Sequence, residues 1–165
     1  MFPRKAWGVL ILSALLALPG YAQKSITVTD QAGGQGQTVT VPVNLSDGAS
    51  VAGSNFTLTY DSNVLQNASI TGGALLSGHS ALSNVPTAGE LRGLIYANPT
   101  AAFNSGAGTM ANLSFTISPN ANPGSTNLTF TEGVLADNTG AVLAGTTTTG
   151  GAITVTGSSF PITES

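Results

Sequence analysis

Apolar and polar residues alternate with a period of two along much of the chain. Two neighbouring segments show the pattern most clearly, because every second position is apolar: Val39, Val41, Val43 and Leu45 in the first, and Phe56, Leu58 and Tyr60 in the second. In a β-strand, such alternation directs one set of side chains to a core and the other to solvent. No window sustains the 3.6-residue period of an amphipathic helix. The pattern therefore predicts an all-β protein.

Similar short segments recur along the chain between runs of Gly, Asn, Asp and Pro, which favour turns. We predict nine strands, at residues 25–29, 38–45, 51–60, 68–71, 91–97, 109–118, 126–131, 134–137 and 152–156. Nine short amphipathic strands indicate a β-sandwich. Pro42 falls inside one of them and has no N–H to donate, which indicates an edge strand or a bulge at that point. Turns are predicted at residues 33–36, 122–124 and 137–140.

The first 22 residues have the organisation of a secretory signal peptide. Arg4 and Lys5 precede an apolar run of 12 residues, and Gly20 and Ala22 occupy the positions that a signal peptidase reads. The run is shorter than the roughly 20 apolar residues that span a bilayer. We therefore predict cleavage after Ala22 and secretion to the extracellular space, and an uncleaved N-terminal anchor is the alternative. The remainder is predicted to form one domain at residues 23–157 with a short polar tail at residues 158–165.

Charge is sparse in the predicted mature chain. Its two basic residues, Lys24 and Arg92, face seven acidic residues, which gives a net charge of −5. Such a chain cannot neutralise many phosphates, so nucleic acid is a disfavoured partner. There is no cysteine, so we expect a domain held by its core without disulfides or thiolate metal sites. No second long apolar run follows the signal peptide, so we expect no membrane association after cleavage.

Residues suited to catalysis are few. His79 is the only histidine, and it lies in a loop-like stretch where we expect an exposed residue rather than a metal ligand or proton relay. No G-x-S-x-G nucleophile motif occurs. Glu90 and Glu132 stay open as a carboxylate pair of the kind that glycosidases use, whereas Asp137 and Asn138 are best explained by a turn. We predict a protein that is not an enzyme and that uses no cofactor or metal.

Seven motifs along the chain give it a family resemblance. They lie at residues 36–43, 51–65, 71–73, 94–97, 110–115, 134–137 and 150–153. The first reads G-x-x-V-x-V-P-V, and the second reads V-A-x-x-x-F-x-L-x-Y-D-x-x-V-L. In this order they resemble the cohesin module, a bacterial extracellular domain that captures dockerin domains in cellulase assemblies. The resemblance implies a nine-stranded jelly-roll β-sandwich, related to one group of carbohydrate-binding domains, with a flat sheet face that docks a dockerin on a partner such as a polysaccharide-degrading enzyme.

The resemblance also places the partner-binding residues. Its contact positions lie on the strand before Tyr60-Asp61 and on the strand that contains residues 94–97. If Leu94 and Tyr96 point inward, the exposed positions are Gly53, Asn55, Thr57 and Thr59 on the first strand, and Ile95, Ala97 and the following Asn98 on the second. Cohesins commonly have an Asn and an Asp at the positions of Gly53 and Asn55, and an acid at that of Asn98. This chain therefore lacks charge-assisted hydrogen bonds to a partner there.

Other functions compete with docking. Direct capture of polysaccharide uses exposed aromatic rings, but Trp7 leaves with the signal peptide, and Tyr60 and Tyr96 both fall on the predicted core side of their strands. Polysaccharide is therefore a possible but disfavoured partner. A structural protein of the cell surface or extracellular matrix is the other alternative, in which the outward Thr, Asn and Gly residues only solvate the sheet.

Overall fold

The computed structural model describes residues 23–97 and 101–157, so the predicted signal peptide and C-terminal tail lie outside the described residues. The described residues form eleven strands and no helix, and hence no helix long and apolar enough to cross a membrane. The strands are β1 (Ser25–Val28), β2 (Gln31–Gly34), β3 (Thr38–Leu45), β4 (Gly53–Thr59), β5 (Leu65–Gly72), β6 (His79–Asn84), β7 (Glu90–Ala97), β8 (Gly108–Ile117), β9 (Gly124–Ala136), β10 (Thr147–Thr149) and β11 (Gly151–Thr156).

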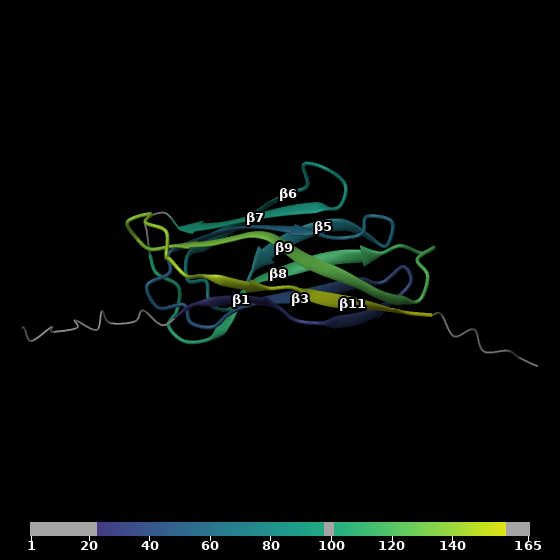
Figure 1. Cartoon of the computed structure of the whole chain (residues 1–165), viewed down its shortest axis with the longest axis horizontal. Coiled ribbons are helices and arrows are strands. Elements are labelled where there is room, and N and C mark those ends of the chain that lie inside the picture. Colours follow the sequence, from purple (N-terminus) through teal and green to yellow (C-terminus); the bar gives the residue numbers. More distant parts are fainter. Residues whose placement is uncertain (1–22, 98–100, 158–165) are drawn as a thin grey trace, which may run out of the picture.

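The strands form two sheets that pack face to face, as Figure 1 shows. One sheet has the order β10-β1-β3-β8-β5, and the other has the order β2-β11-β9-β4-β7-β6. Most neighbours are antiparallel, but β1 pairs with β10 and β2 pairs with β11 in parallel. The chain therefore changes sheets between β1 and β2. The predicted all-β sandwich is confirmed, with eleven strands in the described part of the chain rather than nine.

The extra strands are those whose sequences carry little alternation. β2 has the sequence QAGG and falls partly in a predicted turn, β10 consists of three threonines, and β6 has the sequence HSALSN in a region predicted as loop. These strands form because a neighbouring strand offers unpaired backbone groups. Conversely, the two segments predicted at residues 126–131 and 134–137 are one strand, β9. Its register against β4 shifts between Thr57 and Leu58, where the extra residue is absorbed as a bulge.

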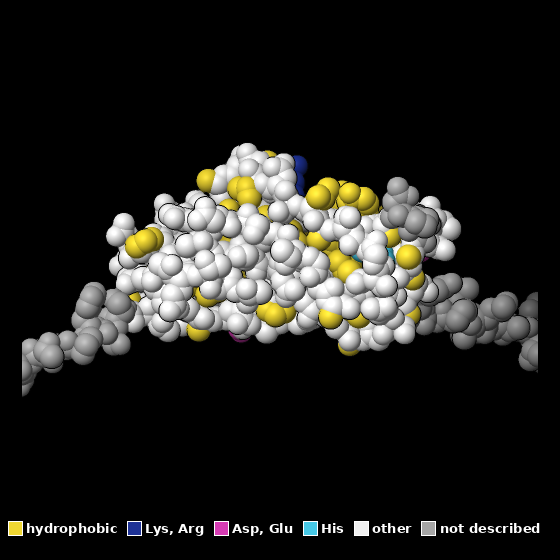
Figure 2. Space-filling model, turned by 180° about the vertical axis from the view of Figure 1, so that it is seen from behind, with side chains coloured by type: hydrophobic (Ala, Val, Ile, Leu, Met, Phe, Trp, Pro, Cys, Tyr) yellow, Lys and Arg dark blue, Asp and Glu magenta, His cyan; other side chains and the backbone are white. Residues whose placement is uncertain are grey.

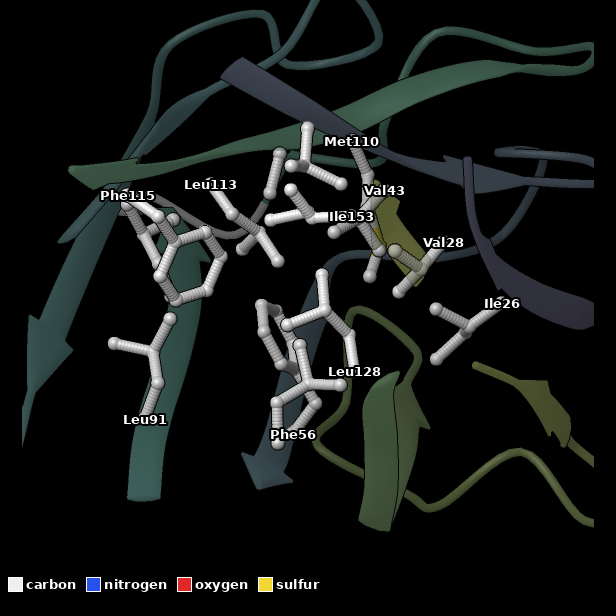
Figure 3. Close-up of a cluster of buried hydrophobic side chains, with 14 of the residues drawn as sticks. Ile26, Val28, Val43, Phe56, Leu91, Met110, Leu113, Phe115, Leu128 and Ile153 are labelled. Carbon is white, nitrogen blue, oxygen red and sulfur yellow. The ribbon is translucent and has the colours of Figure 1, made fainter. Parts of the chain in front are cut away.

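The core lies between the sheets and contains the apolar positions of the alternating strands (Figure 3). Met110, Leu113 and Phe115 of β8 meet side chains that include Phe56 of β4 and Leu91 of β7. Phe56 and Phe115 have no exposed surface. The ring of Tyr60 packs edge-on against Phe115 with 5.2 Å between centroids. The alternation of β3 and β4 therefore predicted the core side of these strands correctly.

Pro42 lies on an internal strand, since β3 is bonded to β1 on one side and to β8 on the other. Its prediction as an edge residue is therefore wrong. The second possibility, a bulge, occurs directly after it, because the register with β8 shifts between Val43 and Asn44. The Asn44 side chain then donates to Thr29 Oγ1 at 2.8 Å and accepts from Thr109 Oγ1 at 2.8 Å. Side-chain hydrogen bonds thus join β3 to its neighbours where the ladder is irregular.

Asp47 ties three segments together at one end of the sandwich. Its carboxylate accepts hydrogen bonds from Ala49 N at 3.0 Å and from Gly106 N at 2.9 Å, and it forms an ion pair with Lys24 Nζ at 3.0 Å. The hydrogen bond from Ala49 N is the largest cause, with those from Lys24 and Gly106 N, that lowers the pKa of Asp47 to about 2. The segment before β1, the β3–β4 loop and the loop before β8 are held by one charged group.

Candidate partner-binding face

The candidate site is the outer face of the four strands β9-β4-β7-β6, which we call the docking face. Residues directly opposite each other on neighbouring strands share one side of a sheet. In the middle of the face, Leu82 pairs with Leu94, Leu94 with Asn55, and Asn55 with Val134. We call these four residues the central row. The strands β4 and β7, on which the resemblance places the contact residues, are thus neighbours.

The orientation of β7 is opposite to the prediction. Ile95 is only 1 % exposed and belongs to the core, whereas Leu94 is 46 % and Tyr96 is 41 % exposed. The assignment of Ile95 as an outward contact residue is therefore wrong, as is the inward placement of Tyr96. Residues 94–97 are apolar or aromatic on both parities, so alternation could not decide between them. Gly93 decides the orientation, because the space of its absent side chain is filled by the ring of Phe56.

The other predicted contact residues have different environments. On β4, Gly53 is half-buried, Asn55 is exposed, and Thr57 is only 9 % exposed. Thr57 nevertheless points to the docking face, since its hydroxyl donates to Glu132 Oε2 at 3.4 Å. Ala97 is half-buried at the end of β7 and has the parity of Ile95. Asn98 lies outside the described residues. The structure brings together Asn55, Thr57 and Gly53, but not Ile95.

Sequence reasoning missed the apolar part of the face. Leu82, Leu94 and Tyr96 are among the exposed large hydrophobic residues, with Leu82 52 % exposed. Figure 2 shows hydrophobic side chains gathered near a basic group along the upper part of the molecule, where β6 and β7 lie in Figure 1. Two shallow hollows of about 270 and 280 Å³ flank Leu94, and both reach Asn55. The missing signal was the strand β6, which carries Leu82 beside Leu94.

Two polar groups in this apolar surface have no partner within the described part of the chain. The amide of Asn55 lies between Leu94 and Val134 in the central row and makes no hydrogen bond with described residues. The hydroxyl of Tyr96 likewise has no hydrogen bond among them. Both side chains are exposed, so water satisfies them in the free protein. An apolar centre with unengaged hydrogen-bonding groups is typical of a protein interface.

Charges lie to one side of the central row. There, Asn84 of β6 pairs with Arg92, Arg92 with Thr57, and Thr57 with Glu132. We call these four residues the charged row. The guanidinium Nε of Arg92 donates to Glu90 Oε1 at 2.6 Å. The carboxylate of Glu132 receives only the long hydrogen bond from Thr57. Arg92 is thus neutralised within the chain, whereas Glu132 is not.

The residues considered for catalysis have structural surroundings. Glu90 and Glu132 lie on β7 and β9 with β4 between them, and Glu90 is engaged by Arg92. His79 is not an exposed loop residue as predicted: it begins β6, is half-buried, and its ring nitrogens lie 3.0 Å from Ser77 O and 2.9 Å from Ala101 O. Its ring also packs edge-on against Phe103. Within residues 23–97 and 101–157, no three His, Asp or Glu side chains gather as a metal site.

Comparisons with known proteins agree with this architecture. The model of the cohesin domain matches residues 25–155. The sixth cohesin of scaffoldin B from Acetivibrio cellulolyticus, solved in complex with a mutant Cel5 dockerin, is 25 % identical; the match covers 82 % of this chain and 100 % of that one, with a TM-score of 0.72. The cohesin CaCohA2, solved in complex with the dockerin CaDoc0917, is 26 % identical, with 81 % and 99 % covered and a TM-score of 0.69.

A third structure extends the likeness in fold. The non-cellulosomal cohesin of the archaeon Archaeoglobus fulgidus is 22 % identical over 82 % of this chain and 92 % of that one, with a TM-score of 0.67. None of the curated proteins compared with the chain matches it significantly. The family match spans both sheets of the sandwich and the whole docking face. The chain belongs to the cohesin family.

Proposed function

We propose that this protein is a non-catalytic docking module that binds a dockerin through the docking face. The observation that carries the proposal is the exposed apolar cluster of Leu82, Leu94 and Tyr96 around Asn55. It lies on the two strands, β4 and β7, where the family resemblance places the partner contacts. Two of the similar cohesins were solved in complex with dockerins, which supports a partner of the same kind here.

The physical chemistry of the face suits a protein partner. Contiguous apolar side chains exposed on a monomer lose free energy when a partner covers them, at about 25 cal/mol per Å². Tyr is enriched among the residues that dominate binding energy, and such residues concentrate near the centre of an interface. A sheet of four strands also offers a rigid surface, so little conformational entropy is lost on docking.

The partner that we propose is a dockerin on a secreted enzyme such as a polysaccharide-degrading hydrolase. This requires export, which the predicted signal peptide at residues 1–22 would supply. The domain at residues 23–157 would then act outside the cell. The lack of acids at Gly53 and Asn55 weakens the case for a dockerin that depends on charge-assisted hydrogen bonds. We therefore expect this protein to prefer dockerins of its own source over those of the two solved complexes.

Calorimetric titration against dockerins tests the proposal. The probes are the Acetivibrio cellulolyticus Cel5 dockerin, CaDoc0917 and dockerins encoded in the source genome. Leu94→Arg should abolish binding, because it places a charge in the apolar centre of the interface. The matched control is Thr40→Arg, which places the same charge at an exposed position of β3 on the opposite sheet and should leave affinity unchanged. Absence of binding to every dockerin would refute the proposal and favour a structural role.

Carbohydrate binding is a weaker second candidate, and one observation favours it. Tyr96 is exposed rather than buried, so one aromatic ring is available to stack on a sugar. A single ring flanked by leucines is a smaller platform than polysaccharide binding uses. Affinity electrophoresis in gels that contain soluble cellulose separates the two functions, since Tyr96→Ala would restore mobility only if the ring holds sugar.

A further inference from the structure

We propose that the docking face selects a partner helix whose centre is apolar and uncharged and which carries one cation opposite Glu132. This inference rests on the proposed function and names the chemistry of the partner. It follows from the charges of the face, which separate into a neutral central row and a charged row with one uncompensated acid. Each part of the face sets a requirement on the dockerin.

The neutral centre excludes a charged contact. The central row consists of Leu82, Leu94, Asn55 and Val134, and the neighbouring pairs beyond it are Ser80 with Tyr96 and Gly53 with Ala136. None of these side chains carries a charge. A partner charge buried against them would lose its hydration without gaining a counter-charge, which is costly. Leu, Ile, Met or Phe side chains fit this surface, because they bury apolar area against Leu82, Leu94 and Tyr96.

Asn55 adds a hydrogen-bonding requirement at the same place. Its amide has both a donor and an acceptor, and neither is engaged within the described residues. If a purely apolar group covered it, the buried amide would be left unsatisfied. The partner therefore needs one neutral group that can bond an amide, such as Ser, Thr, Asn, Gln or a backbone carbonyl. This differs from a carboxylate at the same position, which accepts hydrogen bonds only and favours a cationic or donor-rich partner.

Glu132 sets the position of the single cation. Arg92 is paired with Glu90 at 2.6 Å, so its charge is satisfied within the chain. Glu132 is exposed, and its only hydrogen bond among the described residues is the 3.4 Å contact from Thr57. The charged row thus presents net negative potential at its β9 end. A Lys or Arg of the partner placed over that end gains an ion pair at the rim, which orients the helix along the face.

A displayed dockerin library tests the inference. The library is built on the Acetivibrio cellulolyticus Cel5 dockerin with the surface positions of its cohesin-contacting helices randomised, and it is selected in parallel on four immobilised baits. These are the unaltered protein, Asn55→Asp, Glu132→Gln and Leu94→Arg. The affinities of clones selected on the unaltered protein are then measured against each bait at low and high salt.

We expect the unaltered protein to enrich apolar side chains at the central positions and Lys or Arg at one flank. Glu132→Gln should lose the flank enrichment, weaken selected clones about two- to fivefold, and remove most of the salt dependence of binding. Asn55→Asp should weaken the same clones by roughly tenfold or more, and its own selection should shift to Ser, Thr and Lys. Charged side chains enriched at the centre on the unaltered protein, or an unchanged flank on Glu132→Gln, would overturn the inference.

The outcomes distinguish this inference from the proposed function. If clones bind the unaltered protein and fail on Leu94→Arg, the docking face is the binding surface whatever chemistry the clones carry. If no clone binds, or if clones bind Leu94→Arg equally well, the proposed function itself fails and the inference fails with it.

Discussion

Single residues on β7 decide what kind of surface this protein presents. Gly93 lacks the side chain that would collide with the ring of Phe56, where a Cβ would lie 2.5 Å from Phe56 Cζ. This close approach holds β7 with Leu91 and Ile95 inward, so Leu94 and Tyr96 are exposed. The docking face is therefore apolar because a glycine on the other side of the strand accommodates a core ring.

Phe56→Ala should lower the free energy of unfolding by roughly 3 to 5 kcal/mol, because it removes a fully buried ring and leaves a cavity. Denaturant unfolding of both proteins measures the difference. The control is Leu82→Ala, which truncates a side chain that is 52 % exposed and should change stability by about 0.5 kcal/mol or less. Equal losses for the two variants would contradict the division into core and docking face.

Asp47 makes stability depend on pH at the acidic end. Its pKa is lowered from 3.8 to about 2 in the folded protein, so its stabilising contribution is complete above pH 3.8 and is lost as the pH falls through about 2. Because its side chain is 44 % exposed, solvent screening keeps this contribution small. Melting curves of the unaltered protein and Asp47→Asn should differ at pH 6 and converge towards pH 2. A difference that grew on acidification would show that the carboxylate does not stabilise the fold.

Among the elements, β6 has the largest effect on the candidate site. It adds an edge strand to β7 and places Leu82 directly beside Leu94. Without it, Leu94 would lie at the edge of the sheet and the apolar surface would be half as wide. The side chain of Ser83 also accepts a hydrogen bond from Ile70 N of β5 at 3.3 Å, which links the edges of the two sheets. A strand that the sequence did not predict thus completes the docking face.

Cysteine labelling checks the orientation of β7, and the natural absence of cysteine gives a clean background. In the folded protein, Leu94→Cys should react with a thiol reagent at the rate of an exposed thiol. Ile95→Cys should react at least about a hundredfold more slowly, because the buried position must first open. Both variants should react equally fast in denaturant. Faster labelling of Ile95→Cys than of Leu94→Cys would restore the orientation that the sequence suggested.

At the scale of the whole molecule, the asymmetry between the two sheets separates docking from structure. The five-stranded sheet presents Thr, Ser and Asn on its outer side, among them Thr38, Thr40 and Thr116, and several of these side chains bond one another. The six-stranded sheet instead exposes the unengaged apolar cluster. Only one broad face is therefore suited to a protein partner, and the module should bind in a single orientation relative to its core.

Export is the prediction that belongs to the whole chain. Mass spectrometry of protein recovered outside the cell should show a mature chain that begins at Gln23, because Gly20 and Ala22 fit the specificity of a signal peptidase. Replacement of both with a bulky residue should retain the precursor in the cell. Recovery of an intact precursor from membrane fractions of the unaltered strain would instead indicate an N-terminal anchor.

The sequence alone determined the fold class, the core sides of β3 and β4, and the family, since these depend on local alternation and on motifs within single segments. It could not determine which side of β7 faces solvent, because Leu94, Ile95, Tyr96 and Ala97 are compatible with either side. It also missed β2, β6 and β10, whose pairing comes from neighbouring strands rather than from their own residues. The tertiary structure decided the docking face because the fit of Gly93 against Phe56 and the pairing of Leu82 with Leu94 join segments far apart in the chain.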